Sequence, residues 1–418
     1  MAQEQTAGET AWQRPVALFL SGQSISLFGS MLVQYAVMWY LTLTTKDGGV
    51  LALSTVFGFG PQAVISIFGG VWADRHNRKW LIMGADAAIA LATLVLALLM
   101  MGGNSDLWLI FAVLAVRSTG AGIQTPAVAA LIPQLVPEQQ LLRINGLNQS
   151  IQAGMMLVAP AVAAVLYATL PIQMIFFVDV GTALVGIGLL ALIRVSKVPR
   201  PDGAPSYFTD LVEGIRYAHG HHLVRWLLGL NAVVMVLVGA PSFLTPLMVA
   251  RSFGDEVWKL TVLELSFSIG MLIAGATIGW WGDKLNRLAL ILLASLAFGF
   301  LGIGMGLSTN LWVLYFFMFG IGVAVPAFTT PMMTVLQESV EPETQGRVFG
   351  FFGIVGSVSM PLGMAAFGPL ANVYSVELVL IGTGIANLFA VALSLLPATG
   401  RRALHARNPP IVDEAAAG

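Results

Sequence analysis

Four ionisable side chains stand inside long apolar stretches of this chain: Asp86, Arg117, Asp179 and Glu264. Placing such a group at the centre of a bilayer costs about 2.5 to 3.5 kcal/mol, so each is a candidate for chemistry. Asp179 and Glu264 have no cation in their own stretches. Burial favours the neutral form of such a carboxyl, so we expect both to be able to exchange protons.

Asp86 and Arg117 lie in neighbouring stretches. At 1.5 Å per residue, Asp86 lies about 10 Å inside one end of its helix and Arg117 about 15 Å inside the opposite end of the next. A long arginine side chain could bridge that gap, so we expect these two residues to pair. The pair would be either a structural ion pair or part of a proton pathway.

The composition explains why such groups must be held by membrane helices. Hydrophobic residues make up 57% of the 418 residues and charged residues only 10%, with a mean hydropathy of +0.83. A soluble domain has about 25% charged residues, so that class is excluded. The apolar residues run in unbroken stretches without alternation, which disfavours a β-barrel and favours an all-α membrane protein.

Several kinds of chemistry are absent from the sequence. The chain has no cysteine, and its 20 Lys and Arg residues are balanced by 21 Asp and Glu residues, so neither a cysteine-ligated metal nor nucleic acid is an expected partner. No phosphate-binding loop and no metal-binding motif appears. The sequence therefore predicts no cofactor and no enzymatic activity.

The apolar stretches predict twelve transmembrane helices, six in each half of the chain. Their approximate bounds are 16–43, 51–73, 80–101, 107–131, 143–169, 172–194, 224–250, 258–281, 288–307, 310–336, 346–372 and 375–397. Of the 20 cations, Arg117 lies within a span and three lie on one side, namely Lys46, Arg251 and Lys259. The remaining sixteen mark the other side as cytoplasmic, and both termini lie there.

This count predicts a simple domain organisation. A cytoplasmic tail (1–15) precedes an N-terminal six-helix bundle (16–195), and a C-terminal six-helix bundle (223–397) precedes a second cytoplasmic tail (398–418). The segment between the bundles (196–222) has three prolines among its first ten residues and continues with apolar residues at helical spacing. It predicts a cytoplasmic linker with an amphipathic helix, or else an ordinary solvated loop.

The two halves of the sequence repeat each other. The segment 70–78 (GVWADRHNR) recurs at 279–287 (GWWGDKLNR), and each copy lies between the second and third spans of its half. A Pro-Glu pair followed by Arg-x-x-Gly occurs at 137–146 and again at 342–350. These echoes predict two equivalent bundles related by a pseudo-twofold axis along the membrane normal.

The Gly-x-x-x-Asp-Arg-x-x-Arg-Lys segment at 70–79 and its weaker copy resemble the signature of the major facilitator superfamily, over nearly the whole chain. Segments 70–86, 145–160 and 213–216 resemble its branch of macrolide-efflux proteins and enterobactin exporters. The usual glycine before the second arginine is Asn77 here, and Asn286 in the copy. Since asparagine tolerates the left-handed conformation, we expect it to preserve the turn.

The resemblance implies a gating role for the repeated motif. Asp74 and Asp283 would meet the positive ends of helices of the opposite bundle, near Arg347 and Arg143 respectively, and so favour one of two transport states. The gating set implied by the resemblance is Asp74, Arg75, Arg78, Asp283, Arg287, Arg143 and Arg347. The alternative is that these charges only set the orientation in the membrane.

The resemblance also implies a central cavity between the bundles. Polar and aromatic residues on the spans expected to line it are Gln23, Gln34, Tyr35, Trp39, Gln124, Asn148, Gln152, Asn231 and Phe328. The amides at 145, 148, 149 and 152 share one helical face, which either contacts the substrate or joins helices by hydrogen bonds. Glu264 lies on a span that faces the cavity in this architecture, which favours it as proton carrier over Asp179.

By resemblance, the chain is a secondary efflux transporter of the bacterial cytoplasmic (inner) membrane, acting as a monomer in the lipid bilayer. Its partners would be protons and a bulky hydrophobic small molecule, such as a drug, a macrolide-like or a siderophore-like compound, exchanged by proton-coupled antiport. The alternatives are a proton-coupled importer of a small nutrient and a membrane sensor that does not transport. Intact motifs in both halves disfavour the sensor.

Overall fold

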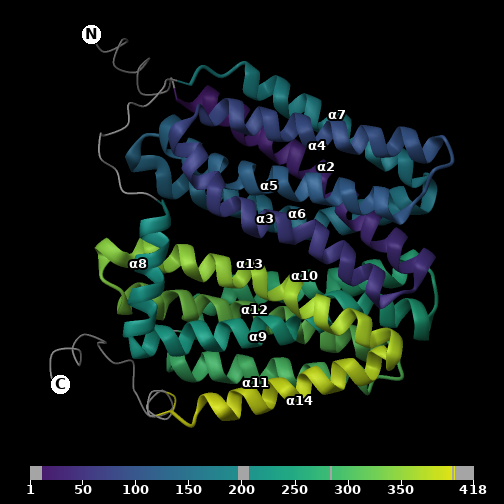
Figure 1. Cartoon of the computed structure of the whole chain (residues 1–418), viewed down its shortest axis with the longest axis vertical. Helices are drawn as coiled ribbons and strands as arrows, with labels where there is room; N and C mark the ends of the chain where they lie inside the picture. The colour runs from purple at the N-terminus through teal and green to yellow at the C-terminus, as the bar shows by residue number, and fades with distance from the viewer. Residues whose placement is uncertain (1–11, 196–206, 283–284, 398–399, 401–418) are drawn as a thin grey trace. The chain divides into compact units, whose positions relative to one another are not determined.

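The chain folds into long α-helices, most of them joined by short connections (Figure 1). The computed structural model describes all residues except 1–11, 196–206, 283–284, 398–399 and 401–418. The helices are α2 (Gln13–Thr45), α3 (Gly48–Arg75), α4 (Arg78–Met101), α5 (Leu107–Leu135), α6 (Leu141–Thr169), α7 (Ile172–Ala191), α8 (Tyr207–Gly220), α9 (His222–Met248), α10 (Val257–Trp281), α11 (Arg287–Gly306), α12 (Leu311–Ser339), α13 (Pro342–Val373) and α14 (Val376–Ser394). All of them except α8 contain a segment long and apolar enough to cross a membrane, which confirms the twelve predicted spans.

The helices group into two compact units. Unit 1 comprises Met1–Thr44 and Leu53–Ala204, and unit 2 comprises Thr45–Ala52 and Pro205–Gly418. In unit 1, α4 packs against α5 and α7; in unit 2, α11 packs against α12 and α14, and α9 against α13 and α14. The pairs α4–α5 and α11–α12 hold the same places in their halves, as do α4–α7 and α11–α14. The packing therefore follows the repeat in the sequence.

The repeated asparagines start α4 and α11. Asn77 (φ −67°, ψ 113°) and Asn286 (φ −64°, ψ 120°) have extended backbones, so the expected left-handed turn is wrong. Their side-chain oxygens accept hydrogen bonds from backbone N–H groups of the first helical turn, at 3.0 Å from Lys79 and 2.9 Å from Leu288. Asparagine is a strong N-cap residue because it pairs these otherwise free donors. Helix capping, rather than turn conformation, explains asparagine at both positions.

His221 forms the corner between α8 and α9. Its Nδ1 accepts the backbone N–H of Val224 at 3.4 Å, and its ring stacks on Tyr217. Burial, with a contribution from the neighbouring His222, lowers the pKa of His221 below 6.5. The unfolded chain then binds the proton more tightly than the folded one, so stability rises with pH across this range.

We therefore expect the melting temperature to fall when the pH is lowered from 7.5 to about 5.5, because a proton on His221 removes the cap of α9. Asparagine keeps a capping oxygen but does not titrate in this range. The melting temperature of His221→Asn in detergent, measured by tryptophan fluorescence, should therefore depend less on pH than that of the wild type. A variant with the wild-type pH profile would exclude His221 as the group responsible.

Candidate functional site

A buried ion pair between two helices of unit 1 is hydrogen-bonded to two further helices. The Arg117 guanidinium on α5 pairs with the Asp179 carboxylate on α7 and donates a further hydrogen bond to the Thr93 hydroxyl on α4. On α2, Ser30 donates its hydroxyl to Asp179 at 3.3 Å, and its carbonyl accepts from Arg117 at 3.3 Å. The Asp179 side chain is 1% exposed. Four helices therefore hold one desolvated charge pair.

Asp86 on α4 lies in a separate polar group of unit 1. One carboxylate oxygen, Oδ1, accepts hydrogen bonds from the Ser26 hydroxyl at 3.0 Å and from the Gln124 amide at 2.8 Å. The other, Oδ2, is buried and has no partner within the described part of the chain. Among the described residues, Asp86 is therefore a buried carboxyl held by two neutral donors.

The expected pair of Asp86 with Arg117 is wrong: Arg117 pairs with Asp179, whose own span contains no cation. The reason is the register of α4 against α5. Gln124 reaches Asp86, and seven residues away on each helix Arg117 reaches Thr93. Seven residues are about 10 Å of helix, so Arg117 lies two turns away from the level of Asp86. Packing of α7 against α4 then brings Asp179 to that level.

Glu264 lies on α10 of unit 2 and is half-buried. No ion pair or hydrogen bond to its side chain occurs among the described residues. A carboxylate in an apolar helix without a partner is costly, which makes its neutral form or a hydrated form the stable state.

The four amides of α6 form a polar face that has no hydrogen-bond partner among the described residues. Asn145, Gln149 and Gln152 are exposed and Asn148 is half-buried. None of the four makes a side-chain hydrogen bond to any described residue, so they do not join helices in this structure. Only 17% of the most apolar window of α6 is buried inside the protein, the lowest share among the twelve spans. The face is free to bind water or a ligand.

The other substrate-binding candidates divide by burial. Gln34 on α2 is exposed, and Tyr35 and Gln23 beside it on the same helix are half-buried. Trp39 and Phe328 are 0% exposed and Asn231 is 3% exposed, so these three have no surface on which a ligand could lie in this structure. Gln124 is half-buried and its amide is used by Asp86. The exposed candidates are therefore Gln34 and, on α6, Gln152, while Asn148 is half-buried like Tyr35 and Gln23.

The arginines of the repeated motif lie in equivalent places in the two units. Arg78, at the start of α4, donates to the backbone carbonyls of Ala73 at the end of α3 (3.0 Å) and of Ala130 on α5 (2.7 Å). Arg287, at the start of α11, pairs with Glu338 at the end of α12. Both connect the motif to the last turns of the fourth helix of their half.

Of the remaining gating candidates, the structure describes the side chains of Arg143 and Arg347 only. Asp74 and Arg75 belong to the last turn of α3, and their side chains lie outside the described part of the structure, as does Asp283 entirely. Arg143 is exposed on the first turn of α6, and Arg347 is half-buried on α13.

Arg347 lies under α8, a contact that the sequence did not predict. A Cβ added to Gly214 of α8 would lie 2.6 Å from the Arg347 carbonyl oxygen, so only glycine allows this approach. Helix α8 packs on α13 and α9. The amphipathic helix therefore belongs to unit 2 and covers the segment that carries the second copy of the Arg-x-x-Gly motif.

We expect Gly214→Ala to displace α8 from Arg347, because the methyl group would meet backbone rather than a flexible side chain. Overpacking of this kind costs about 1 to 3 kcal/mol. Transport and melting temperature should both fall. The matched control is Gly220→Ala in the same helix, where an added Cβ meets no atom within 4 Å. Equal behaviour of the two variants would contradict the close contact.

The three cations expected on the non-cytoplasmic side lie in a polar cluster of unit 2. Lys46 pairs with Asp255 at 2.7 Å, and Lys259 with Glu256 at 2.6 Å. Arg251 donates to the backbone carbonyls of Lys46 (3.0 Å) and Ala371 (2.6 Å) and to the side chain of Asn372 (2.9 Å). Arg251 thereby holds the segment Thr45–Ala52 against the end of α13. Its neighbours in space are far apart in sequence, so no sequence pattern signalled this cluster.

Within the described residues, no group of three His, Asp or Glu side chains could hold a metal ion. The histidines around the start of α9 make other contacts: His219 accepts from Arg225 through its carbonyl at 3.0 Å, and a His222 ring nitrogen lies 3.1 Å from the Arg225 guanidinium.

Comparison with known proteins identifies the family. The sequence profile of the transmembrane secretion effectors, a family of the major facilitator superfamily, matches residues 16–415. The chain belongs to this family. Macrolide efflux protein A of Streptococcus pyogenes is 33% identical over 360 residues, which cover 84% of this chain and 88% of that protein. The enterobactin exporter EntS of Salmonella typhi is 22% identical over 400 residues, 95% of each chain.

Solved structures agree with this membership at the level of the fold. A bacterial homologue of the human lysosomal transporter Spinster superposes with a TM-score of 0.69 at 14% identity, over 94% of this chain and 98% of that one. The secretion effector thus has the twelve-helix all-α fold of major facilitator transporters. Its relatives are transporters and not enzymes, in agreement with the prediction from sequence.

Proposed function

We propose that this secretion effector exports a bulky, mostly apolar compound by alternating access of its two helix bundles. The observation that carries the proposal is the similarity to macrolide efflux protein A over 84% of the chain. Macrolide-like compounds are the first substrate class to test, and siderophore-like compounds the second, because an enterobactin exporter is also a relative. Orientation with both termini in the cytoplasm of a bacterial cell is part of the proposal, supported by the distribution of cations.

The amide face of α6 is the proposed polar part of the binding surface. Its exposed members Asn145, Gln149 and Gln152 have no hydrogen-bond partner among the described residues. An unpaired amide facing lipid would be costly, so this face needs water or a polar group of a ligand. A large apolar compound with several oxygens, such as a macrolide, matches a line of amides on an otherwise apolar helix.

Proton antiport is the proposed source of energy. Glu264 and Asp86 are carboxyls without a cationic partner within the described structure, and each would be stabilised by taking up a proton where no charge compensates it. The charge of Asp179 is compensated by Arg117, so Asp179 could take up a proton only if the ion pair separated. These differences rank Glu264 and Asp86 above Asp179 as carriers.

Transport into inverted membrane vesicles tests the function. Vesicles containing the protein should accumulate a radiolabelled macrolide when an inward-acidic proton gradient is imposed, and accumulation should collapse when an ionophore removes the gradient. Vesicles without the protein are the control. Accumulation that requires the opposite gradient would favour an importer, and equal label in both kinds of vesicle would exclude macrolide transport.

Gating by the repeated motif is proposed on the resemblance and on its duplication. Asp74→Asn should reduce macrolide uptake into inverted vesicles about tenfold with little change in melting temperature, because a latch acts on the balance of two states and not on folding. The control is Glu138→Gln, an exposed carboxylate of the next loop on the same predicted side. Wild-type uptake by Asp74→Asn would exclude the latch.

A further inference from the structure

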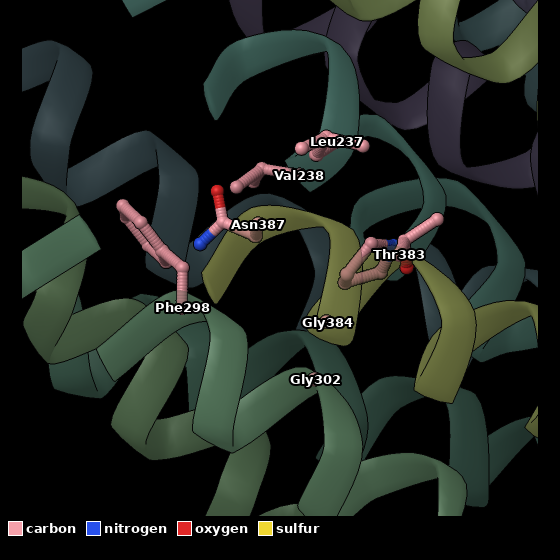
Figure 2. Close-up of a pocket in the computed structure, with 8 residues that line it drawn as sticks. Leu237, Val238, Phe298, Gly302, Thr383, Gly384 and Asn387 are labelled. Atoms are coloured by element: carbon pink, nitrogen blue, oxygen red, sulfur yellow. The ribbon is translucent and has the colours of Figure 1, made fainter. Parts of the chain in front are cut away.

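A small cavity lies inside unit 2 where α9, α11 and α14 meet (Figure 2). The space has room for about one water molecule, about 10 Å³. Its lining consists of residues from these three helices: Leu237, Val238, Pro241, Phe298, Gly302, Thr383, Gly384 and Asn387.

One polar atom at this cavity lacks a partner. Asn387 is 2% exposed, and its amide nitrogen donates to the Ser295 carbonyl at 2.6 Å. Its side-chain oxygen Oδ1 has no hydrogen-bond partner within the described part of the chain. Figure 2 shows the Asn387 amide among the lining side chains. A buried carbonyl without a donor is disfavoured, so a donor is expected in the space beside it.

A second acceptor comes from the proline in α9. Pro241 has no N–H, so the carbonyl of Leu237, four residues earlier, loses its α-helical donor. Leu237 lines the same cavity. A water molecule has two O–H groups and could donate to both acceptors at once.

The repeat shows what occupies the corresponding place in unit 1. Thr93 and Gly302 each stand fifteen residues after the first residue of α4 and α11, respectively. Asp179 and Thr383 each stand seven residues after the first residue of α7 and α14. Gly302 and Thr383 line the cavity, whereas Thr93 and Asp179 bind Arg117.

The arginine itself has an apolar counterpart. Arg117 stands ten residues after the start of α5, and Ile321 stands ten residues after the start of α12. Ile321 is 2% exposed. Unit 2 thus replaces threonine by glycine, aspartate by threonine and arginine by isoleucine, which removes both charges and leaves space.

We propose that this cavity is a binding site for one water molecule, which takes the place in unit 2 of the Arg117–Asp179 ion pair in unit 1, with Asn387 Oδ1 and the Leu237 carbonyl as its acceptors. The lining contains no charged side chain, so the ligand is neutral. At these equivalent positions, only the N-terminal half can then contribute charge to the transport cycle.

X-ray radiolysis in ¹⁸O-labelled water tests the site in the full-length protein in detergent, because side chains beside bound water are oxidised faster than dry ones. Phe298 lines the cavity, and Phe328, with its ring centroid 5.9 Å away, does not; both are buried. We expect Phe298 to take up label about fivefold faster than Phe328, and Asn387→Leu to abolish the difference.

A gentler variant keeps the test decisive if Asn387→Leu fails to fold. An added Cβ at Gly302 would meet its nearest neighbour, Gly384 Cα, at 3.6 Å, so Gly302→Ala fills space without a clash. It should slow the labelling of Phe298, whereas Gly382→Ala, with no atom within 4 Å of the added Cβ, should not. Equal labelling of the two phenylalanines in the wild type, or undiminished labelling in folded Gly302→Ala, would overturn the proposal.

Discussion

Arg117→Ala should lose a large part of the folding stability of this protein. The substitution leaves the Asp179 carboxylate, 1% exposed, without its cation, and breaking a buried pair in this way costs about 3 to 5 kcal/mol. Total folding stabilities are about 5 to 15 kcal/mol, so the loss is a large fraction. The yield of monodisperse protein after detergent extraction and its melting temperature measure the effect.

Removing the charges of both Arg117 and Asp179 distinguishes a structural role of the ion pair from a role in transport. A double variant, Arg117→Leu with Asp179→Leu, leaves no uncompensated charge and should recover much of the melting temperature, as apolar replacements of buried pairs often do. If the pair takes part in the transport cycle, the folded double variant should still fail to transport. Full transport by the double variant would assign the pair a structural role only.

Arg216→Ala is the matched control for stability. Arg216 is exposed on α8 and makes no ion pair with any described residue, so its loss should change the melting temperature little. Similar losses in Arg117→Ala and Arg216→Ala would contradict the importance of burial.

Glu264→Gln should uncouple export from the proton gradient. Glutamine keeps the size and polarity of the side chain but cannot exchange a proton, so the stimulation of uptake by an inward-acidic gradient should fall about tenfold or more. Binding of the labelled macrolide at equilibrium should persist, because the substitution does not alter the amide face of α6. Uptake into inverted vesicles with and without the gradient measures the coupling.

Asp106→Asn is the control for Glu264→Gln. Asp106 is an exposed carboxylate before α5, and its side chain does not cap that helix. It should retain gradient-driven uptake. Wild-type coupling in Glu264→Gln would exclude Glu264 as carrier and leave Asp86, another carboxyl inside a span with no cation among the described residues, as the next residue to neutralise.

The start of α4 shows which structural features local sequence predicts and which it does not. The repeated segments 70–78 and 279–287 predicted matching structures at two places, and Asn77 and Asn286 do start matching helices. The role of the asparagine was predicted incorrectly, because the same residue type serves both left-handed turns and helix caps. A cap differs from a turn in the direction of the following backbone, which residue identity alone does not specify.

In the candidate site, too, the sequence predicted the ionisable residues but not their contacts. Asp86, Arg117, Asp179 and Glu264 were all found from sequence, because a charge in an apolar stretch is costly wherever the helix packs. Their partners were not found, because the choice between Asp86 and Asp179 for Arg117 depends on a shift of two helical turns between α4 and α5. Burial of Trp39 and Phe328 likewise depends on which side of each helix meets its neighbours.

By itself, the sequence determined that this protein is a bundle of twelve membrane helices in two repeated halves, because span length, hydropathy and duplication are properties of consecutive residues. Only the tertiary structure decided that Arg117 pairs with Asp179, that α8 lies on Arg347 through Gly214, and that the amides of α6 make no side-chain hydrogen bond to any described residue. Helix register and rotation set these contacts. They are fixed by the packing of surfaces that are distant in the chain, since a shift of one or two turns exchanges every partner while leaving the pattern of each helix unchanged.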